Sequence, residues 1–299
     1  MLTIGNFDGL HLGHQALLNL LADRASALRL PASVLTFEPH PREYFSPDDA
    51  PARLTSLREK LLLLSDNGVD HAHVQRFNAH FSRQSAEAFI QSVLVRGLKV
   101  RHLLIGDDFR FGEHRNGDFA MLQAAGHTHG FKVEAMPTLS VAGARASSSA
   151  VRKALETGEL DHAAQLLGRA YSIAGQVMRG NQLGRKIGFP TLNIALRHRR
   201  PALSGVFTVE VEGLHRPRLQ GVANIGARPT VSNTSQPRLE IHLLDFSDEC
   251  YGAHLRVHFF HKLRDELRFP SLDALKKQIE LDTQAARNWF SQHPNALRG

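Results

Sequence analysis

The chain has 299 residues, enough for two domains, with 42% apolar residues, 22% charged residues and a net charge of +7. The longest apolar run, Leu61–Leu64, is far too short to span a membrane, and the N-terminus lacks the segments of a secretory signal. Cys250 is the only cysteine, which excludes an intrachain disulfide and argues against a thiolate metal cluster. These features favour a cytoplasmic protein without membrane partners.

The positive charge suits nucleic acid or small phosphorylated ligands. No recognition helix, aromatic stacking platform or continuous basic face is readable in the sequence, which argues against nucleic acid as the partner. We expect a monomer or a weak oligomer.

The first half of the chain alternates short apolar runs with helical patterns. Strands are predicted at Leu2–Gly5, Ser33–Phe37, His71–Phe77, His102–Ile105 and Phe131–Met136. Helices are predicted at His14–Leu28, from the capping signature at Ser56 to Gly68, at Ala86–Arg96 and at Phe119–Ala125. This alternation predicts βαβ units with a parallel sheet, whose ligands bind beyond the carboxyl ends of the strands.

The pattern changes near Ser147. Helices are predicted at Val151–Glu156 and Leu160–Leu167, then alternating strands at Val206–Val211, Leu239–Leu243 and Leu255–Phe259. Glycine turns between these runs predict a small β-barrel. A closing helix from Ser271 carries an apolar stripe that we expect to pack against the barrel. We place the domain boundary between 168 and 169, which gives domains 1–168 and 169–299.

The segment His11-Leu12-Gly13-His14 follows the first strand and opens the first helix. A helix N-terminus attracts phosphate through its unpaired N–H groups and its dipole, and Gly13 would let a nucleotide approach the backbone closely. Two imidazoles three positions apart share one helical face and can donate to phosphate oxygens as charge moves onto departing pyrophosphate. The motif predicts nucleotidyl transfer, the alternative being two ordinary solvent-facing histidines.

The segment from Ile4 to His14 resembles the opening of the bacterial bifunctional riboflavin kinase/FMN adenylyltransferase (FAD synthetase) family. Three further blocks agree in order, at Thr36–Pro41, Gly106–Gly112 and Ser147–Arg152. The resemblance implies a Rossmann-like α/β nucleotidyltransferase domain with a parallel sheet, followed by a Greek-key β-barrel with a closing helix.

The resemblance also implies the residues of the first site. ATP would be bound by Gly5, Phe7, His11, Gly13, His14, Ser148, Ser149 and Arg152. FMN would be bound by Phe37, Pro39, His40, Pro41, Asp108, Phe109 and Phe111. His11 and His14 would act in the chemistry itself.

The second half carries glycine-rich pieces followed by Pro190-Thr191-Leu192-Asn193, and no Walker A loop. A Thr hydroxyl and an Asn carbonyl are hard oxygen ligands that suit Mg²⁺, although a capped turn explains the pattern equally simply. This half resembles a riboflavin kinase domain. The resemblance assigns Thr191 and Asn193 to Mg-ATP and Glu240 to the general base. It implies ATP or flavin binding by Gly180, Gly184, Arg185, Gly188, Pro190, Thr191, Asn193, Asn224, Arg228 and Arg264.

Together these patterns predict an enzyme that phosphorylates riboflavin with Mg-ATP and then joins FMN to AMP to give FAD. Three departures from the family pattern bear on the first site: the chain begins close to the motif, Ala150 stands where many relatives have arginine, and Asp108 replaces an asparagine found in some. The alternatives are a riboflavin kinase alone, with an impaired adenylyl site, and a binding module without turnover.

Overall fold

A computed structural model describes residues 1–106, 108–136, 140–141, 144–179, 184, 188–196, 200–215, 218–226 and 237–294. Contacts divide the chain into two compact units, Met1–Pro51 with Leu57–Ser147, and Ala52–Ser56 with Ser148–Gly299. This division by contacts places residues 148–168 in the second unit. The domain boundary between 168 and 169 stays a prediction.

The first unit contains the predicted parallel sheet, with described strands in the order β3-β2-β1-β4-β5. The strands are β1 (Leu2–Ile4), β2 (Ser33–Glu38), β3 (His71–Arg76), β4 (His102–Gly106) and β5 (Lys132–Met136), with a small ribbon of β6 (Ser140–Val141) and β7 (Ala144–Arg145). The helices are α1 (Leu12–Leu28), α2 (Pro41–Phe45), α3 (Leu57–Asp66), α4 (Ala79–Ser82), α5 (Ala86–Phe89), η1 (Ile90–Gly97), η2 (Glu113–Arg115) and α6 (Phe119–His129).

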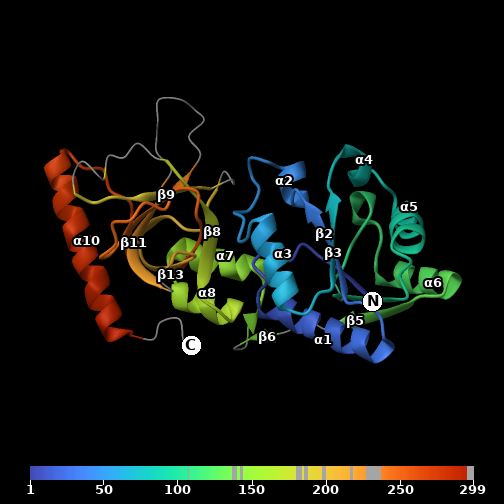
Figure 1. Ribbon diagram of the computed structural model, residues 1–299. Coiled ribbons are helices and arrows are strands. Elements are labelled where there is room, and N and C mark those ends of the chain that lie inside the picture. Colours follow the sequence, from blue (N-terminus) through green and yellow to red (C-terminus); the bar gives the residue numbers. More distant parts are fainter. Residues whose placement is uncertain are drawn as a thin grey trace. The chain divides into compact units, whose positions relative to one another are not determined.

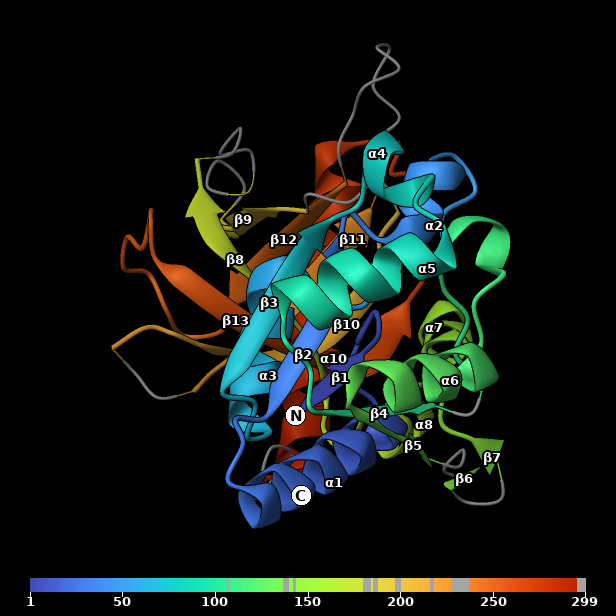
Figure 2. The ribbon, with the colours of Figure 1, turned by 90° about the vertical axis from the view of Figure 1, so that its right-hand side faces the viewer.

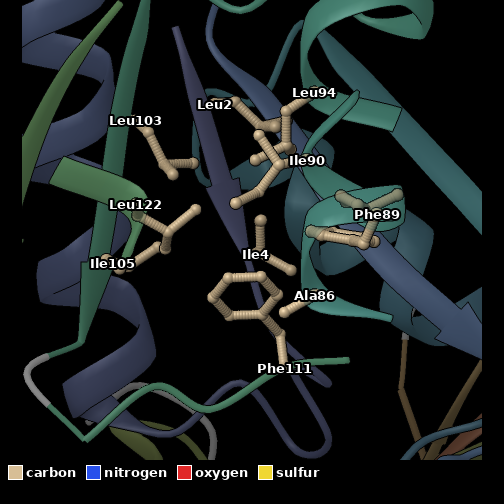
Figure 3. Close-up of a cluster of buried hydrophobic side chains, with 11 residues drawn as sticks. Leu2, Ile4, Ala86, Phe89, Ile90, Leu94, Leu103, Ile105, Phe111 and Leu122 are labelled. Carbon is tan, nitrogen blue, oxygen red and sulfur yellow. The ribbon is translucent and has the colours of Figure 1, made fainter. Parts of the chain in front are cut away.

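Helices cover both faces of this sheet (Figure 2). Successive side chains of a strand point to opposite faces, so β4 sends Leu104 to one face and Leu103 and Ile105 to the other. The first face packs on α1 and α3, and the second packs on α5, η1 and α6 (Figure 3). Burial on both faces explains why the central strands read as continuous apolar runs.

Several predicted helices differ from the structure: α6 continues to His129 rather than Ala125, and α7 (Ser148–Thr157) begins three residues before the predicted Val151. The first helix begins at Leu12, two residues earlier than predicted, because His11 serves as its N-cap. The predicted helix Ala86–Arg96 is α-helical only as far as Phe89 and continues as the π-helix η1 to Gly97.

The second unit contains α7 (Ser148–Thr157), α8 (Leu160–Leu167) and a closed barrel whose described strands run in the order β10-β11-β12-β9-β8-β13. The strands are β8 (Tyr171–Met178), β9 (Leu192–Ala195), β10 (Gly205–Glu212), β11 (Leu219–Gly226), β12 (Arg238–Leu243) and β13 (His254–Arg264). The predicted fold is confirmed: a parallel α/β sheet followed by an antiparallel barrel and a final helix.

The barrel interior is filled by alternate residues of its strands. Phe207, Val209, Ile241 and Phe259 are at most 1% exposed. The final helix α10 (Leu272–Gln292) begins at the N-cap Ser271, whose hydroxyl accepts from the Ala274 N–H, and it lies along the outside of the barrel wall (Figure 1). No helix in the described part of the chain is long and apolar enough to cross a membrane.

Candidate active sites

The turn between β1 and α1 holds backbone conformations that L-residues rarely adopt. Phe7 and Leu10 have φ values of 48° and 42°, and Gly9 lies between them at 82°. Each non-glycine residue in this region costs on the order of 1–3 kcal/mol and persists only where its surroundings hold it. Here the side chains of Phe7 and Leu10 are fully buried, and their packing stabilises the backbone conformation of the turn. The turn therefore presents the start of α1 in a fixed conformation.

His11 and His14 meet at this helix start. The Nδ1 atom of His11 accepts the backbone N–H of His14 at 3.4 Å, so the proton of a neutral His11 ring resides on Nε2. The two rings stack with centroids 3.7 Å apart and an interplanar angle of 22°. The contact arises from His11 capping the helix, rather than from two positions within one helical face. The structure thus brings the two predicted rings together beside the unpaired N–H groups of α1.

His14 is held as a neutral imidazole. Burial lowers its pKa well below the ordinary value, and the nearby positive charges of His11 and Lys60 lower it further. Its Nδ1 atom is buried and makes no hydrogen bond to any residue that the structure describes. Lys60 is 1% exposed and donates to the hydroxyl of Thr36 at 3.4 Å. Sequence reasoning did not single out Lys60, which carries no motif of its own.

Gly5 and Gly13 lie close to neighbouring atoms that would crowd a side chain at either position. A Cβ atom on Gly5 would lie 3.0 Å from the ring of Phe7. A Cβ atom on Gly13 would lie 3.2 Å from the His11 ring and 3.3 Å from the carbonyl oxygen of Ala146. Glycine at position 13 therefore makes room for the His11 ring, in addition to the predicted close approach of a nucleotide.

A chain of aromatic rings joins the two segments predicted to bind FMN. Phe37 lies 5.9 Å from Phe81, Phe81 lies 6.1 Å from Phe89, and Phe89 lies 5.4 Å from Phe111. Phe111 in turn stacks on Phe109 at 5.7 Å. Sequence reasoning missed Phe81 and Phe89, because nothing in their spacing marks them as neighbours of Phe37.

The same chain branches toward the surface. Phe77 contacts Phe37, Tyr44, Phe45 and Phe81, at centroid distances between 5.5 and 6.0 Å. Phe45 is 63% exposed, which is unusual for so large an apolar ring. These rings form an accessible apolar surface suited to a planar ring system.

The remaining residues predicted to bind FMN lie at turns. Pro39 and His40 connect β2 to α2 and Pro41 is the first residue of that helix; His40 is the N-cap, and its Nδ1 accepts the Arg42 N–H at 3.1 Å. Asp108 is exposed in the turn after β4. Their contact with FMN stays a prediction.

Ser148, Ser149 and Arg152 lie in the first turns of α7, which belongs to the second unit. Arg152 Nε donates to the carbonyl oxygen of Ala52 at 2.6 Å, so its side chain is bound to the segment Ala52–Ser56 of the same unit rather than merely solvated. Binding of ATP phosphates by these three residues stays a prediction.

The barrel places the predicted kinase residues in one row. Glu240 on β12 lies opposite Asn193 on β9 and Asn224 on β11, and Asn224 lies opposite Val206, which pairs with Arg264 on β13. Directly opposed residues point to the same face of a sheet. The flanking residues Leu239 and Ile241 point into the barrel, so the row faces outward, toward α10.

This row forms one wall of a pocket of about 310 Å³. Gly184 and Thr191 also line it, so six of the predicted residues meet there. The Asn224 Oδ1 atom is buried and accepts no hydrogen bond from the described residues, as expected of a group that awaits a ligand. Gly188, with φ of 90°, and Pro190, whose carbonyl oxygen accepts from His242 Nδ1 at 3.0 Å, lie beside the pocket.

The other wall was not anticipated. It is formed by the segment after β13 and by α10, through Glu266, Leu267, Phe269, Leu275, Ile279 and Asp282. The sequence predicts that the stripe on the closing helix packs against the barrel, and the structure shows that Leu275 and Ile279 also line the pocket. A stripe facing a barrel and a stripe facing a pocket have the same period, so the sequence does not separate them.

Three predicted kinase residues, Gly180, Arg185 and Arg228, lie outside the described residues. Within the described ranges, no group of three or more His, Cys, Asp or Glu side chains could hold a metal ion.

Comparisons with known proteins agree with both halves. Residues 1–150 match the FAD synthetase family, and residues 167–290 match the riboflavin kinase family. A bifunctional riboflavin kinase/FMN adenylyltransferase of Escherichia coli (strain K12) is 49% identical over 290 residues, covering 97% of this chain and 92% of the relative. The protein with the same description from Haemophilus influenzae is 48% identical, covering 97% of this chain and 94% of the relative.

A solved structure described as a macrolide-efflux protein from Streptococcus pneumoniae is similar over 96% of this chain and 94% of its own, with a TM-score of 0.80 and 28% identity. The family matches in both halves and the near-complete relatives lead to one conclusion: the chain belongs to the bifunctional riboflavin kinase/FMN adenylyltransferase family.

Proposed function

We propose that the two activities of the family, riboflavin kinase and FMN adenylyltransferase, are carried by separate sites, one at the barrel pocket and the other at the start of α1. Together the activities make FAD. The row Asn193–Glu240–Asn224 in the pocket wall carries the kinase assignment, because it sets a carboxylate between two amide side chains inside a pocket. The stacked His11 and His14 rings at the start of α1 support the adenylyl assignment.

In adenylyl transfer, an oxygen of the FMN phosphate attacks the α-phosphorus of ATP. The new P–O bond forms as the bond from that phosphorus to the bridging oxygen breaks, and pyrophosphate leaves. His14 is neutral and a neutral His11 ring carries its proton on Nε2, so both rings act as hydrogen-bond donors to the developing charge. The N-terminus of α1 adds its dipole. Phe89 and Phe111 belong to the buried core, so the half-buried rings Phe37, Tyr44 and Phe77 and the exposed Phe45 supply the surface for the flavin ring.

In the kinase reaction, Glu240 accepts the proton of the terminal ribityl hydroxyl, whose oxygen then attacks the γ-phosphorus of ATP. ADP is the leaving group and FMN is the product. Asn193 and Asn224, on the strands beside Glu240, hold the polar end of the substrates. Leu267, Phe269, Leu275 and Ile279 suit the flavin ring at the other wall.

Mg²⁺ fits the polar end of the pocket. Thr191 and Asn193 offer hard oxygen ligands, and Asn193 is 9% exposed with its Nδ2 directed to the Thr191 carbonyl oxygen at 3.5 Å, which leaves Oδ1 as the ligand atom. Mg²⁺ commonly keeps several waters and substrate phosphates as ligands, so a carboxylate cage is not required. When bound, it neutralises charge on the ATP phosphates.

The test is incubation of the protein with riboflavin and Mg-ATP, followed by separation of the flavins over time. We expect FMN first, then FAD with release of pyrophosphate. FMN supplied in place of riboflavin tests the adenylyl site alone, and a failure to produce FAD there would leave only the kinase. Chelation of Mg²⁺ with EDTA is expected to stop phosphorylation, and unchanged phosphorylation would contradict the magnesium assignment.

A further inference from the structure

The closing helix contributes a buried carboxylate to the kinase pocket. Asp282, on α10, is 5% exposed and lines the pocket beside Ile279. A carboxylate is so fully removed from water only when it is paired. Its partner is Arg264, which ends β13 and closes the row that begins at Asn193.

The geometry of this pair fixes the guanidinium. Arg264 Nε donates to the two carboxylate oxygens of Asp282 at 3.0 and 3.1 Å, and Nη2 donates to Oδ2 at 2.7 Å. Gln278, one turn earlier on α10, donates to Asp282 Oδ1 at 2.9 Å. Arg264 Nη1 donates to the carbonyl oxygen of Asp265 at 2.9 Å. A bidentate arginine–carboxylate pair sets the plane of the guanidinium as well as its position.

The pair also changes what Arg264 can recognise. A guanidinium carries five N–H groups, of which Asp282 and Asp265 take three among the described residues, so two remain for a ligand. Asp282 at 2.7 Å cancels the positive charge. The pair therefore offers directional donors without net charge, which suits a neutral oxygen better than a phosphate.

The position of Arg264 agrees with that conclusion. Arg264 stands three strands from Glu240, roughly 14 Å along the barrel wall at ordinary strand spacing. This separation places it away from the phosphoryl group handled at Glu240. Its guanidinium carbon lies 5.7 Å from the ring centroid of Phe269, at the apolar side of the pocket. The ring of riboflavin carries carbonyl oxygens, and the ribityl chain carries the hydroxyl that is phosphorylated.

We propose that Asp282 is a positioning residue for the kinase reaction. It holds and neutralises Arg264, so that the guanidinium donates to a ring carbonyl oxygen of riboflavin. This inference rests on the proposed kinase function of the pocket and specifies how that pocket selects its flavin.

The experiment compares steady-state kinase kinetics of the full chain with those of Asp282→Asn. Asparagine removes the counter-charge of the guanidinium and replaces one of the two acceptor oxygens by an NH₂ group, so the bidentate pair is lost. We expect the KM for riboflavin to rise on the order of 10- to 100-fold, while kcat and the KM for ATP stay near wild type. Asp282→Glu, which keeps the charge, is expected to recover part of the affinity.

A second ion pair supplies the matched control. Arg287 on α10 donates to both oxygens of Asp245 at 2.7 and 2.8 Å, and thus also ties the helix to the barrel, at a place outside the pocket. Asp245→Asn is expected to leave the KM for riboflavin unchanged. In an Arg264→Gln background, Asp282→Asn is expected to add no further loss, because Asp282 acts through Arg264.

An unchanged KM for riboflavin in Asp282→Asn would overturn the inference. So would an equal loss in Asp245→Asn, or independent, additive effects of the Arg264 and Asp282 variants. If Asp282→Asn does not fold, Asp282→Glu and Arg264→Gln decide by the same KM criterion. Absence of kinase activity in the wild-type protein would instead refute the proposed function itself.

Discussion

His14→Ala is expected to remove most FAD formation from FMN while phosphorylation of riboflavin continues. His14 is one of two ring donors at the start of α1, stacked 3.7 Å from His11. Loss of one preorganised donor to developing charge typically costs about 10²- to 10³-fold in rate, or roughly 2.7–4 kcal/mol. The kinase pocket is lined entirely by residues of the second unit, so its rate has no reason to fall.

The fold is expected to survive this change. The imidazole contacts the His11 ring and lies 5.0 Å from the ring of Phe7, so its removal leaves a cavity. Cavities of this kind typically cost about 1–3 kcal/mol. The substitution also removes a buried group whose ionisation the fold disfavours. Loss of activity from unfolding can therefore be separated from loss of the donor.

The assay supplies FMN and Mg-ATP and follows pyrophosphate release and FAD, with riboflavin phosphorylation measured in the same preparation. His127→Ala, at an exposed position on α6, is the matched control and should retain both activities. A loss of adenylyl transfer smaller than about tenfold would refute the donor role of His14. A parallel loss of both activities would refute the separation of the sites.

Other changes test the remaining assignments. Glu240→Gln should lower the rate of riboflavin phosphorylation by about 10²- to 10⁴-fold and leave FMN adenylylation unchanged. The control Glu280→Gln, at an exposed position on α10, should change neither rate. Wild-type phosphorylation by Glu240→Gln would exclude Glu240 as the base. Gly13→Ala places a Cβ atom 3.2 Å from the His11 ring, so adenylyl transfer should fall with little change in melting temperature, and an unaffected rate would contradict the crowding argument. Burial, followed by the charges of His11 and Lys60, lowers the pKa of His14 in the folded state. Because the unfolded state therefore binds a proton more readily, the free energy of unfolding is at its full value above about pH 6.5 and declines as the pH falls from there toward the folded-state pKa. Urea unfolding at pH 7 and 5.5 should therefore show a smaller loss for His14→Gln than for wild type, and equal losses would argue against a buried neutral His14.

The sequence alone determined the succession of elements and the outline of both sites. Alternating apolar runs in the first half and period-two runs in the second reflect local geometry, because strands repeat every two residues and helices every 3.6. The motifs His11-x-Gly13-His14 and Thr191-x-Asn193 are recognisable in the sequence because the members of each lie within four consecutive residues, at the start of α1 and of β9.

The tertiary structure decided which distant residues meet. The barrel register sets Asn193, Glu240, Asn224 and Arg264 in one row, although they come from four strands far apart in the chain. Asp282 joins them only because α10 crosses the outside of that wall, and its helical periodicity does not tell a pocket residue from a packing one. Likewise the stacking of His11 on His14 comes from the cap geometry at α1, and the lowered pKa of His14 comes chiefly from burial. Spacing along the chain determines which way neighbouring side chains point. Strand register determines which distant side chains meet, and burial determines their charge state. Both depend on contacts between segments that are far apart in the sequence.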